Sequence, residues 1–250
     1  MPDEKVRKQP HYGHYALQWM GYTVFFMYLV AVILSYLYLV LAGVIVAIFG
    51  TYLITSYMIG LRILDQHNPF PPPKTLKLTG EEHVLDIGCG LGKMTVGIAK
   101  KLTTGKVTGL DLWVSAEIPG NSPERAKKNA QLEAVEDRVE FESGDVRSMQ
   151  FNDSTFDVVT ALTLMNNIRG HEDKMLALSE ILRVLKPDCQ FLLVEVPRDR
   201  WGMLMVTPLM YWSMLKKEQW IELLEEVGFV DISYERYRKM TTILARKPAR

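Results

Sequence analysis

The chain has 250 residues, with 29 basic and 29 acidic side chains, and so carries no net charge at neutral pH. This balance argues against a nucleic-acid substrate, because proteins that bind nucleic acids carry a basic face. The two cysteines, Cys89 and Cys189, do not make a disulfide framework, and no cysteine–histidine cluster in the sequence has zinc spacing, so no metal is expected.

A long uncharged segment lies near the N-terminus. Residues 9–61 contain no Asp, Glu, Lys or Arg, and the most apolar stretch is Leu17–Leu61. One helix crosses the hydrocarbon core with about 20 residues, so this stretch fits two helices, expected at about 15–37 and 43–63. The connection at 35–43 is unusually apolar for a loop that reaches water. A hairpin that dips into one leaflet is therefore an alternative to two spanning helices.

Basic residues flank this segment on both sides: Lys5, Arg7, Lys8, Arg62, Lys74 and Lys77. Because basic flanks tend to stay in the cytoplasm, both ends on that side require an even number of crossings. The apolar run is far longer than the roughly 7–15 residues of a signal-peptide core. The other alternative is a buried helix of a soluble protein. Residues 1–64 are thus expected to form an integral membrane anchor, with the remaining domain on the cytoplasmic face.

Residues 65–74 form a proline-rich linker, because consecutive prolines exclude helix and favour an extended chain. Strand-like and helix-like stretches then alternate through residues 75–250, which predicts a doubly wound, Rossmann-like α/β domain. No helix separates the last two of seven expected strands, so these two should form an antiparallel hairpin at one sheet edge. The expected strands are 83–87, 106–111, 138–142, 156–161, 189–196, 231–236 and 239–245.

A glycine-rich loop, Asp86-Ile-Gly-Cys-Gly-Leu-Gly92, follows the first expected strand. In a doubly wound sheet, ligands bind beyond the carboxyl ends of the strands. Asp111 ends the second strand, where a carboxylate can bind ribose hydroxyls, and Asp145 follows the third, where it can accept from an adenine amino group. The loop alone also suits a tight turn or a nicotinamide cofactor. The latter is disfavoured because Gly92 falls two residues after Gly90 and not three.

These motifs, with Phe-Asp157-Val-Val, Leu-Lys-Pro187 and Glu-Glu-Val-Gly-Phe229, resemble the successive motifs of class I S-adenosylmethionine (SAM)-dependent methyltransferases. The resemblance is closest to the small-molecule subgroup that includes ubiquinone and menaquinone methyltransferases, and it covers about 75–247. It implies SAM as cofactor. The glycines would let the chain pass the methionine and ribose, and Asp86 would contact the methionine amino group through water or backbone. The implied cofactor residues are Asp86, Ile87, Gly88, Cys89, Gly90, Asp111, Leu112, Asp145, Val146 and Leu162.

The sequence departs from the family pattern at two places. The usual Lys-Pro-Gly-Gly turn before the fifth strand is here Lys-Pro-Asp-Cys189, which alters a turn and not the chemistry. The loop 112–122 after Asp111 is longer than the family needs. It lies near the ribose edge, where it is either part of a lid or an inert surface excursion.

The acceptor side has no strong catalytic signature, and the sequence lacks the Asn/Asp-Pro-Pro-Tyr/Phe motif of exocyclic amine methylation. Asn166 and Asn167 follow the fourth strand, where they orient a polar acceptor or cap the next helix. His171 is a candidate general base, since histidine titrates near neutrality, or a surface residue at a helix start. Cys89 is a poor candidate nucleophile because the glycine loop should bury it.

The segment 201–215 is rich in methionine and aromatic residues, so it is either core or an adaptable apolar wall that covers a substrate. The expected substrate-lining residues are Asn166, Asn167, Trp201, Met205, Met210 and Tyr211.

We therefore expect a membrane-anchored SAM-dependent methyltransferase whose partners are the lipid bilayer and a small hydrophobic or amphipathic acceptor, such as a lipid, quinone or isoprenoid. This places the chain in lipid metabolism. The alternatives are a methyltransferase of small thiols or amines and a degenerate SAM-binding scaffold protein. Methylation of protein or RNA is disfavoured by the lack of basic character. The oligomeric state and the atom methylated are not predicted.

Overall fold

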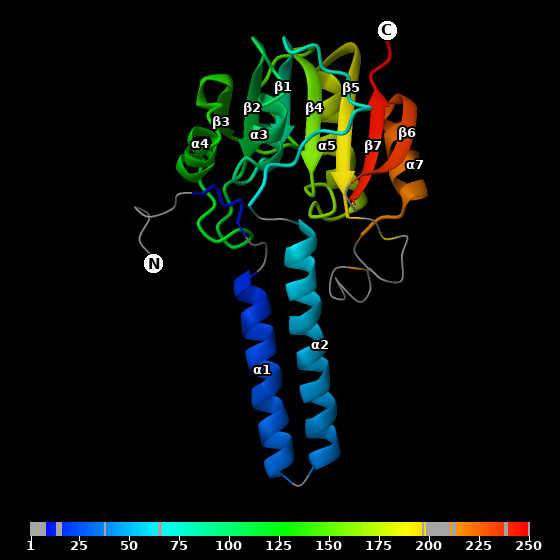
Figure 1. The fold of residues 1–250 in the computed structure, drawn as a ribbon. Helices are drawn as coiled ribbons and strands as arrows, with labels where there is room; N and C mark the ends of the chain where they lie inside the picture. The colour runs from blue at the N-terminus through cyan, green and yellow to red at the C-terminus, as the bar shows by residue number, and fades with distance from the viewer. Residues whose placement is uncertain are drawn as a thin grey trace.

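The computed structural model describes residues 9–13, 17–37, 39–64, 67–196, 198, 211, 214–237 and 240–249. In this part of the chain, two long helices form a hairpin that projects from an α/β domain (Figure 1).

The hairpin consists of α1 (Leu17–Tyr36) and α2 (Val40–Leu64), and its turn lies at the end farthest from the α/β domain (Figure 1). Small residues allow the two helices to approach closely: a Cβ atom on Gly43 would collide with the side chain of Ser35. Farther along, the hydroxyls of Tyr28 and Thr51 share a hydrogen bond of 2.6 Å. Because α2 begins at Val40, Gly43 lies inside this helix, and the turn is shorter than the expected 35–43.

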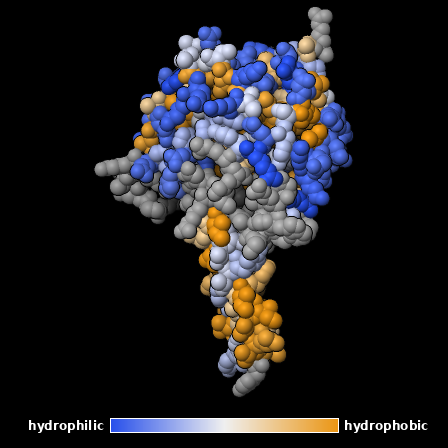
Figure 2. Space-filling model, turned by 45° about the vertical axis from the view of Figure 1, so that its right-hand side comes forward, coloured by the Kyte–Doolittle hydropathy of each residue, from blue (hydrophilic) through white to orange (hydrophobic). Residues whose placement is uncertain are grey.

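The surface of the hairpin is apolar. Windows at Trp19–Tyr36 and Val40–Gly60 are long and apolar enough to cross a bilayer, a property that core helices of soluble proteins and signal sequences can share. A core helix is mostly buried, whereas only 11% and 22% of these two windows are buried inside the protein. Figure 2 shows apolar side chains gathered on the far half of the hairpin, below a largely hydrophilic domain surface.

The domain contains a seven-stranded sheet of order β3-β2-β1-β4-β5-β7-β6. Strands β1 to β5 run parallel, and β7 is antiparallel to both β5 and β6, which confirms the expected doubly wound sheet with an antiparallel closing hairpin. The carboxyl ends of the parallel strands face the hairpin (Figure 1). The strands are β1 (His83–Ile87), β2 (Lys106–Asp111), β3 (Val139–Ser143), β4 (Phe156–Leu162), β5 (Leu185–Glu195), β6 (Val230–Tyr237) and β7 (Met240–Arg246).

Helices cover both faces of the sheet. One face carries α3 (Lys93–Ala99) and α4 (Pro123–Leu132), followed by the short 3-10 helix η2 (Glu136–Arg138). The other face carries α5 (His171–Val184) and α7 (Lys217–Val227), whose Ile181 and Trp220 are buried against the sheet.

The proline-rich linker is packed onto the α3 face. Phe70 and Leu76 are buried in the same apolar cluster as Ile98 of α3 and Leu192 of β5. The linker also crosses toward the far edge of the sheet, where the Thr75 hydroxyl donates to the Glu235 carboxylate at 2.8 Å. Residues 70–78 therefore cover part of the sheet that neither α3 nor α4 covers, and the linker is part of the domain core.

Candidate functional site

The glycine loop leaves β1 and turns into α3. Gly88 and Gly90 have φ of 63° and 51°, the left-handed region that disfavours side chains. A Cβ on Gly88 would lie 2.6 Å from a methyl carbon of Leu164. The Cys89 N–H donates to the Leu110 carbonyl at 3.1 Å, which ties the loop to β2. The loop thus needs glycine both for its conformation and for its close approach to the β4–α5 loop.

Asp111, the last residue of β2, organises three segments. One carboxylate oxygen accepts from the Gly90 N–H at 2.8 Å. The other accepts from the Trp113 N–H at 2.7 Å and from the Asn121 amide at 3.0 Å. A carboxylate has about four lone-pair sites, so Asp111 retains capacity for a ligand hydroxyl. Its position between the glycine loop and loop 112–122 fits the expected ribose contact.

Asp145, after β3, is bound by Arg147, a residue with no signal in the sequence. The Arg147 guanidinium donates to Oδ2 of Asp145 at 2.6 Å, to Oδ1 of Asp145 at 3.1 Å, and to Asp173 of α5 at 2.6 Å. These hydrogen bonds outweigh burial and hold the pKa of Asp145 below its ordinary value. Asp145 is therefore a fixed, ionised acceptor.

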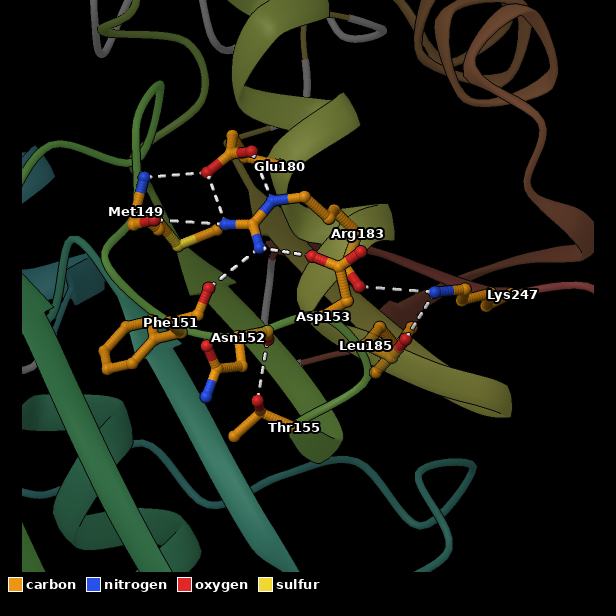
Figure 3. Close-up of polar contacts among 9 residues, drawn as sticks. All are labelled: Met149, Phe151, Asn152, Asp153, Thr155, Glu180, Arg183, Leu185 and Lys247. Carbon is orange, nitrogen blue, oxygen red and sulfur yellow. Dashed lines mark hydrogen bonds and ion pairs between the residues drawn. The ribbon is translucent and has the colours of Figure 1, made fainter.

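A second arginine holds the loop that carries these residues. Figure 3 shows Arg183 of α5 pointing into the β3–β4 loop, with contacts to Glu180, Asp153 and the main-chain oxygens of Met149 and Phe151. The Glu180 carboxylate also accepts from the Met149 N–H at 2.7 Å. This network fixes the segment that follows Asp145 on the surface of α5.

These residues surround a cleft of about 330 Å³ at the carboxyl ends of the strands. Apolar walls come from Leu112 and Val114 on one side and from Leu164 and Ile168 on the other. A size of a few hundred Å³ with mixed apolar and polar walls is typical of small-molecule sites. Six of the predicted site residues line the cleft: Gly88, Asp111, Leu112, Asp145, Val146 and Asn167.

Four predicted cofactor residues, Ile87, Cys89, Gly90 and Leu162, are not among those lining the cleft, and neither is Asp86. Asp86 is buried, and its two oxygens accept from the hydroxyls of Thr95 at 2.6 Å and Thr160 at 2.8 Å. Burial raises the pKa of Asp86 to about 7. Its contact with the methionine amino group stays a prediction, and its observed contacts join β1, α3 and β4. Burial also raises the pKa of the Cys89 thiol, which disfavours a nucleophilic thiolate.

On the acceptor side, Asn166 donates hydrogen bonds to a buried carboxylate at the end of β5. The Glu195 side chain accepts from the Asn166 N–H at 3.1 Å and from its amide at 2.8 Å. The Asn166 oxygen accepts from the Leu215 N–H at 3.3 Å. Burial raises the pKa of Glu195 to about 7. Glu195 had no signal in the sequence, and it positions the β4–α5 loop that lines the cleft.

The other acceptor-side candidates differ in placement. Asn167 lines the cleft while its amide donates to the Thr163 carbonyl at 3.0 Å. His171 is exposed at the start of α5, 3.6 Å from the Glu226 carboxylate. The Tyr211 ring lies beneath the Arg198 guanidinium at 5.5 Å. Trp201, Met205 and Met210 lie outside the described residues.

Residues 84–188 match the family profile of a methyltransferase domain. The chain is 34% identical to a demethylmenaquinone methyltransferase of Lactiplantibacillus plantarum over 56% of this chain and 55% of that protein. It is also 34% identical to a sterol 4-C-methyltransferase of Caenorhabditis elegans over 48% of this chain and 33% of that protein. The chain thus spans about half or less of the length of these relatives.

Solved structures show the same fold. A SAM-dependent methyltransferase of Methanosarcina mazei aligns with a TM-score of 0.55 at 21% identity, over 69% of this chain and 95% of that one. One from Aquifex aeolicus aligns with a TM-score of 0.58 at 17% identity, over 70% and 86% of the two chains. The profile match, the relatives and the shared fold together identify residues 84–188 as part of a class I SAM-dependent methyltransferase domain. SAM is the cofactor of such domains, and the ordered Asp111 and Asp145 carboxylates and the glycine loop around the cleft fit it.

Proposed function

We propose that the protein is a membrane-anchored SAM-dependent methyltransferase that methylates a small hydrophobic or amphipathic acceptor, such as a lipid, quinone or isoprenoid. One observation carries this proposal: the cleft lies at the carboxyl ends of the parallel strands, and these ends face the apolar hairpin (Figure 1). With the hairpin in a bilayer, the cleft faces the membrane surface. An acceptor that leaves the bilayer then reaches the methyl donor without crossing bulk water.

The cleft walls support an apolar acceptor. Leu164 and Ile168 form an apolar wall on the side of the β4–α5 loop. Leu112 and Val114, which are 58% and 40% exposed, follow Asp111 on the side expected to bind SAM. Two relatives, a demethylmenaquinone methyltransferase and a sterol 4-C-methyltransferase, are named for acceptors of the same apolar class.

The residues of the chain act mainly by positioning. SAM supplies an electrophilic methyl group, and transfer to a nucleophile is an in-line displacement whose rate depends strongly on orientation and on exclusion of water. We assign the ribose to Asp111 and the adenine to Asp145 and Val146. Leu164 and Ile168, on the Glu195-supported loop, hold the acceptor in line. The basic flanks of the hairpin support a location of the domain on the cytoplasmic face.

The test uses the full chain in lipid nanodiscs with methyl-labelled SAM. The acceptors are a polyprenylated demethylquinone, its tail-free soluble analogue, a small thiol and a small amine. We expect transfer to the polyprenylated acceptor, with a lower apparent KM than for the analogue. Preferred transfer to the thiol or amine would refute a membrane-derived acceptor. Absence of turnover with all four, despite SAM binding, would favour the scaffold alternative.

Membrane anchoring is tested separately by washing membranes with alkaline carbonate and high salt. Retention in the membrane fraction is expected, because the outward side chains of both helices are apolar. Release into the supernatant would contradict the anchor, and the interpretation of the cleft orientation would fail with it.

A further inference from the structure

The short segment before the hairpin is attached to the glycine loop. The His11 N–H donates to the Asn129 side-chain oxygen at 3.1 Å, and the Asn129 amide donates back to the His11 carbonyl at 3.1 Å. The same amide donates to the Leu91 carbonyl at 2.9 Å. Asn129 is buried in α4, at 6% exposure. The Asn129 side chain therefore joins the segment before the hairpin to Leu91 of the glycine loop.

A second contact lies two residues closer to α1. Gly13 has φ of 80°, and a Cβ there would collide with Ile118 and lie 3.2 Å from a methyl carbon of Leu91. The other end of the Ile118 side chain lies 3.1 Å from the position of a Cβ on Gly90. Ile118 of loop 112–122 is thus packed between the segment before the hairpin and the glycine loop.

The segment after the hairpin is attached to the helix that follows this loop. The Phe70 N–H donates to the carbonyl of Lys93, the first residue of α3, at 3.0 Å. A Cβ on Gly97 of α3 would collide with the Phe70 carbonyl, so the two backbones are in direct contact. The rings of His11 and His67 meet edge to face with their centroids 5.4 Å apart. Both ends of the hairpin therefore converge on the glycine loop and α3.

We propose that residues 9–13 and 67–70 form a clamp through which the hairpin holds the glycine loop in its SAM-binding conformation, with Asn129 and Gly13 as positioning residues. The loop has left-handed glycines, which lose much conformational freedom on ordering. External contacts that order the loop before SAM arrives remove this cost from binding. Since the clamp is continuous with α1 and α2, the membrane segment also supports the cofactor site. The inference depends on SAM as the cofactor and not on the identity of the acceptor.

The decisive variant is Asn129→Leu, which keeps a similar size and removes all three hydrogen bonds. SAM affinity is measured by calorimetry on the full chain in nanodiscs, without acceptor. We expect binding to weaken about tenfold, the effect of losing one to two net hydrogen bonds that preorganise the loop. The matched control is Lys128→Leu at the neighbouring exposed position of α4. Its affinity should stay within about twofold of that of the wild type.

Gly13→Val tests the second contact of residues 9–13, with Ile118 and Leu91, without removing any hydrogen bond to Leu91. It should also weaken SAM binding. Hydrogen exchange of the unliganded protein separates positioning from general instability. In both variants exchange should accelerate at residues 88–92 and stay unchanged in β5. Wild-type affinity in both variants, an equal loss in Lys128→Leu, or faster exchange throughout the sheet would overturn the clamp. A wild-type protein that does not bind SAM would overturn both the clamp and the proposed function, whereas SAM binding without lipid methylation would overturn only the latter.

Discussion

Asp111→Asn separates the ligand contact of this residue from its structural contacts. The substitution keeps the size of the side chain but removes its charge and replaces one acceptor oxygen by a donor. The oxygen that accepts from Trp113 and Asn121 can remain in place, so the new amide faces the Gly90 N–H, which is also a donor. The glycine loop then loses its hydrogen bond to the side chain of residue 111 and keeps the main-chain bond from Cys89 to Leu110.

The internal hydrogen bonds of Asp111 exist with and without SAM, so their loss lowers the free energy of unfolding. Because one of them orders the glycine loop, its loss also raises the Kd, by about the tenfold expected for Asn129→Leu. The ribose contact exists only in the complex, so its loss changes the Kd. A hydrogen bond to a charged group contributes about 1.5–3 kcal/mol, which corresponds to a Kd increased about tenfold to over a hundredfold. The Tm therefore reports the internal contacts, and a Kd increase well beyond about tenfold reports the ribose contact.

Calorimetric titration with SAM and thermal unfolding should be compared for wild type, Asp111→Asn and Asp137→Asn. Asp137 is an exposed residue of η2 paired with Arg138 at 3.4 Å, so it controls for loss of one negative charge. We expect a higher Kd and a lower Tm only in Asp111→Asn. A lower Tm with a Kd raised only about tenfold would show that Asp111 organises the loops without binding the ribose.

Two further predictions concern stability. The pKa of Asp86 is raised from 3.8 to about 7 in the folded state. The protonated side chain therefore stabilises the fold fully below about pH 4. This stabilisation, about 4 kcal/mol, is lost as the pH rises to about 7. Asp86→Asn should flatten the fall in the free energy of unfolding between these pH values, measured by urea titration; an unaltered pH profile would contradict a buried ionisable carboxyl. Arg183→Lys should lower the free energy of unfolding by about 1.5–3 kcal/mol, because an ammonium cannot replace the fork of contacts in Figure 3. Lys247→Arg, at the neighbouring main-chain contact to Leu185, is the conservative control, and equal stability of Arg183→Lys and wild type would count against the network.

The sheet could be predicted because buried parallel strands give short apolar runs between helices. The start of the fifth strand could not be predicted from such an apolar run. It was expected at 189–196, but β5 begins at Leu185, directly after α5. Lys-Pro-Asp188 reads as a turn, and Asp188 does have φ of 61°. However, the strand continues through this turn. The Asp188 N–H donates to the Lys247 carbonyl at 3.1 Å, and the pairing of β5 with β4 shifts register between Phe156 and Val158.

Asp111 and Asp145 could be placed at the cleft because parallel strands end at one edge, so residues that follow them converge. Arg147, Glu195 and Asn129 could not be predicted, because their roles depend on contacts that no local pattern encodes. Asn129 binds His11 across 118 positions of sequence, and Glu195 binds Asn166 across 29. In each case an ordinary polar residue gains its role from the segment that the fold brings beside it.

The proline-rich linker explains how the hairpin and the cleft can both lie at the carboxyl ends of the parallel strands. Because the cleft lies at the carboxyl end of β1, β1 must run toward the hairpin. The chain therefore first travels to the opposite end of the strands, where the Gly80 carbonyl accepts from the N–H groups of Thr103 and Gly105. Residues 70–80 make this crossing without helix or strand, in two stretches separated by a turn in which the Leu76 N–H donates to the Pro73 carbonyl at 3.2 Å. The consecutive prolines exclude helix from the first stretch. A chain that entered β1 directly from α2 would leave the hairpin at the end of the sheet remote from the cofactor.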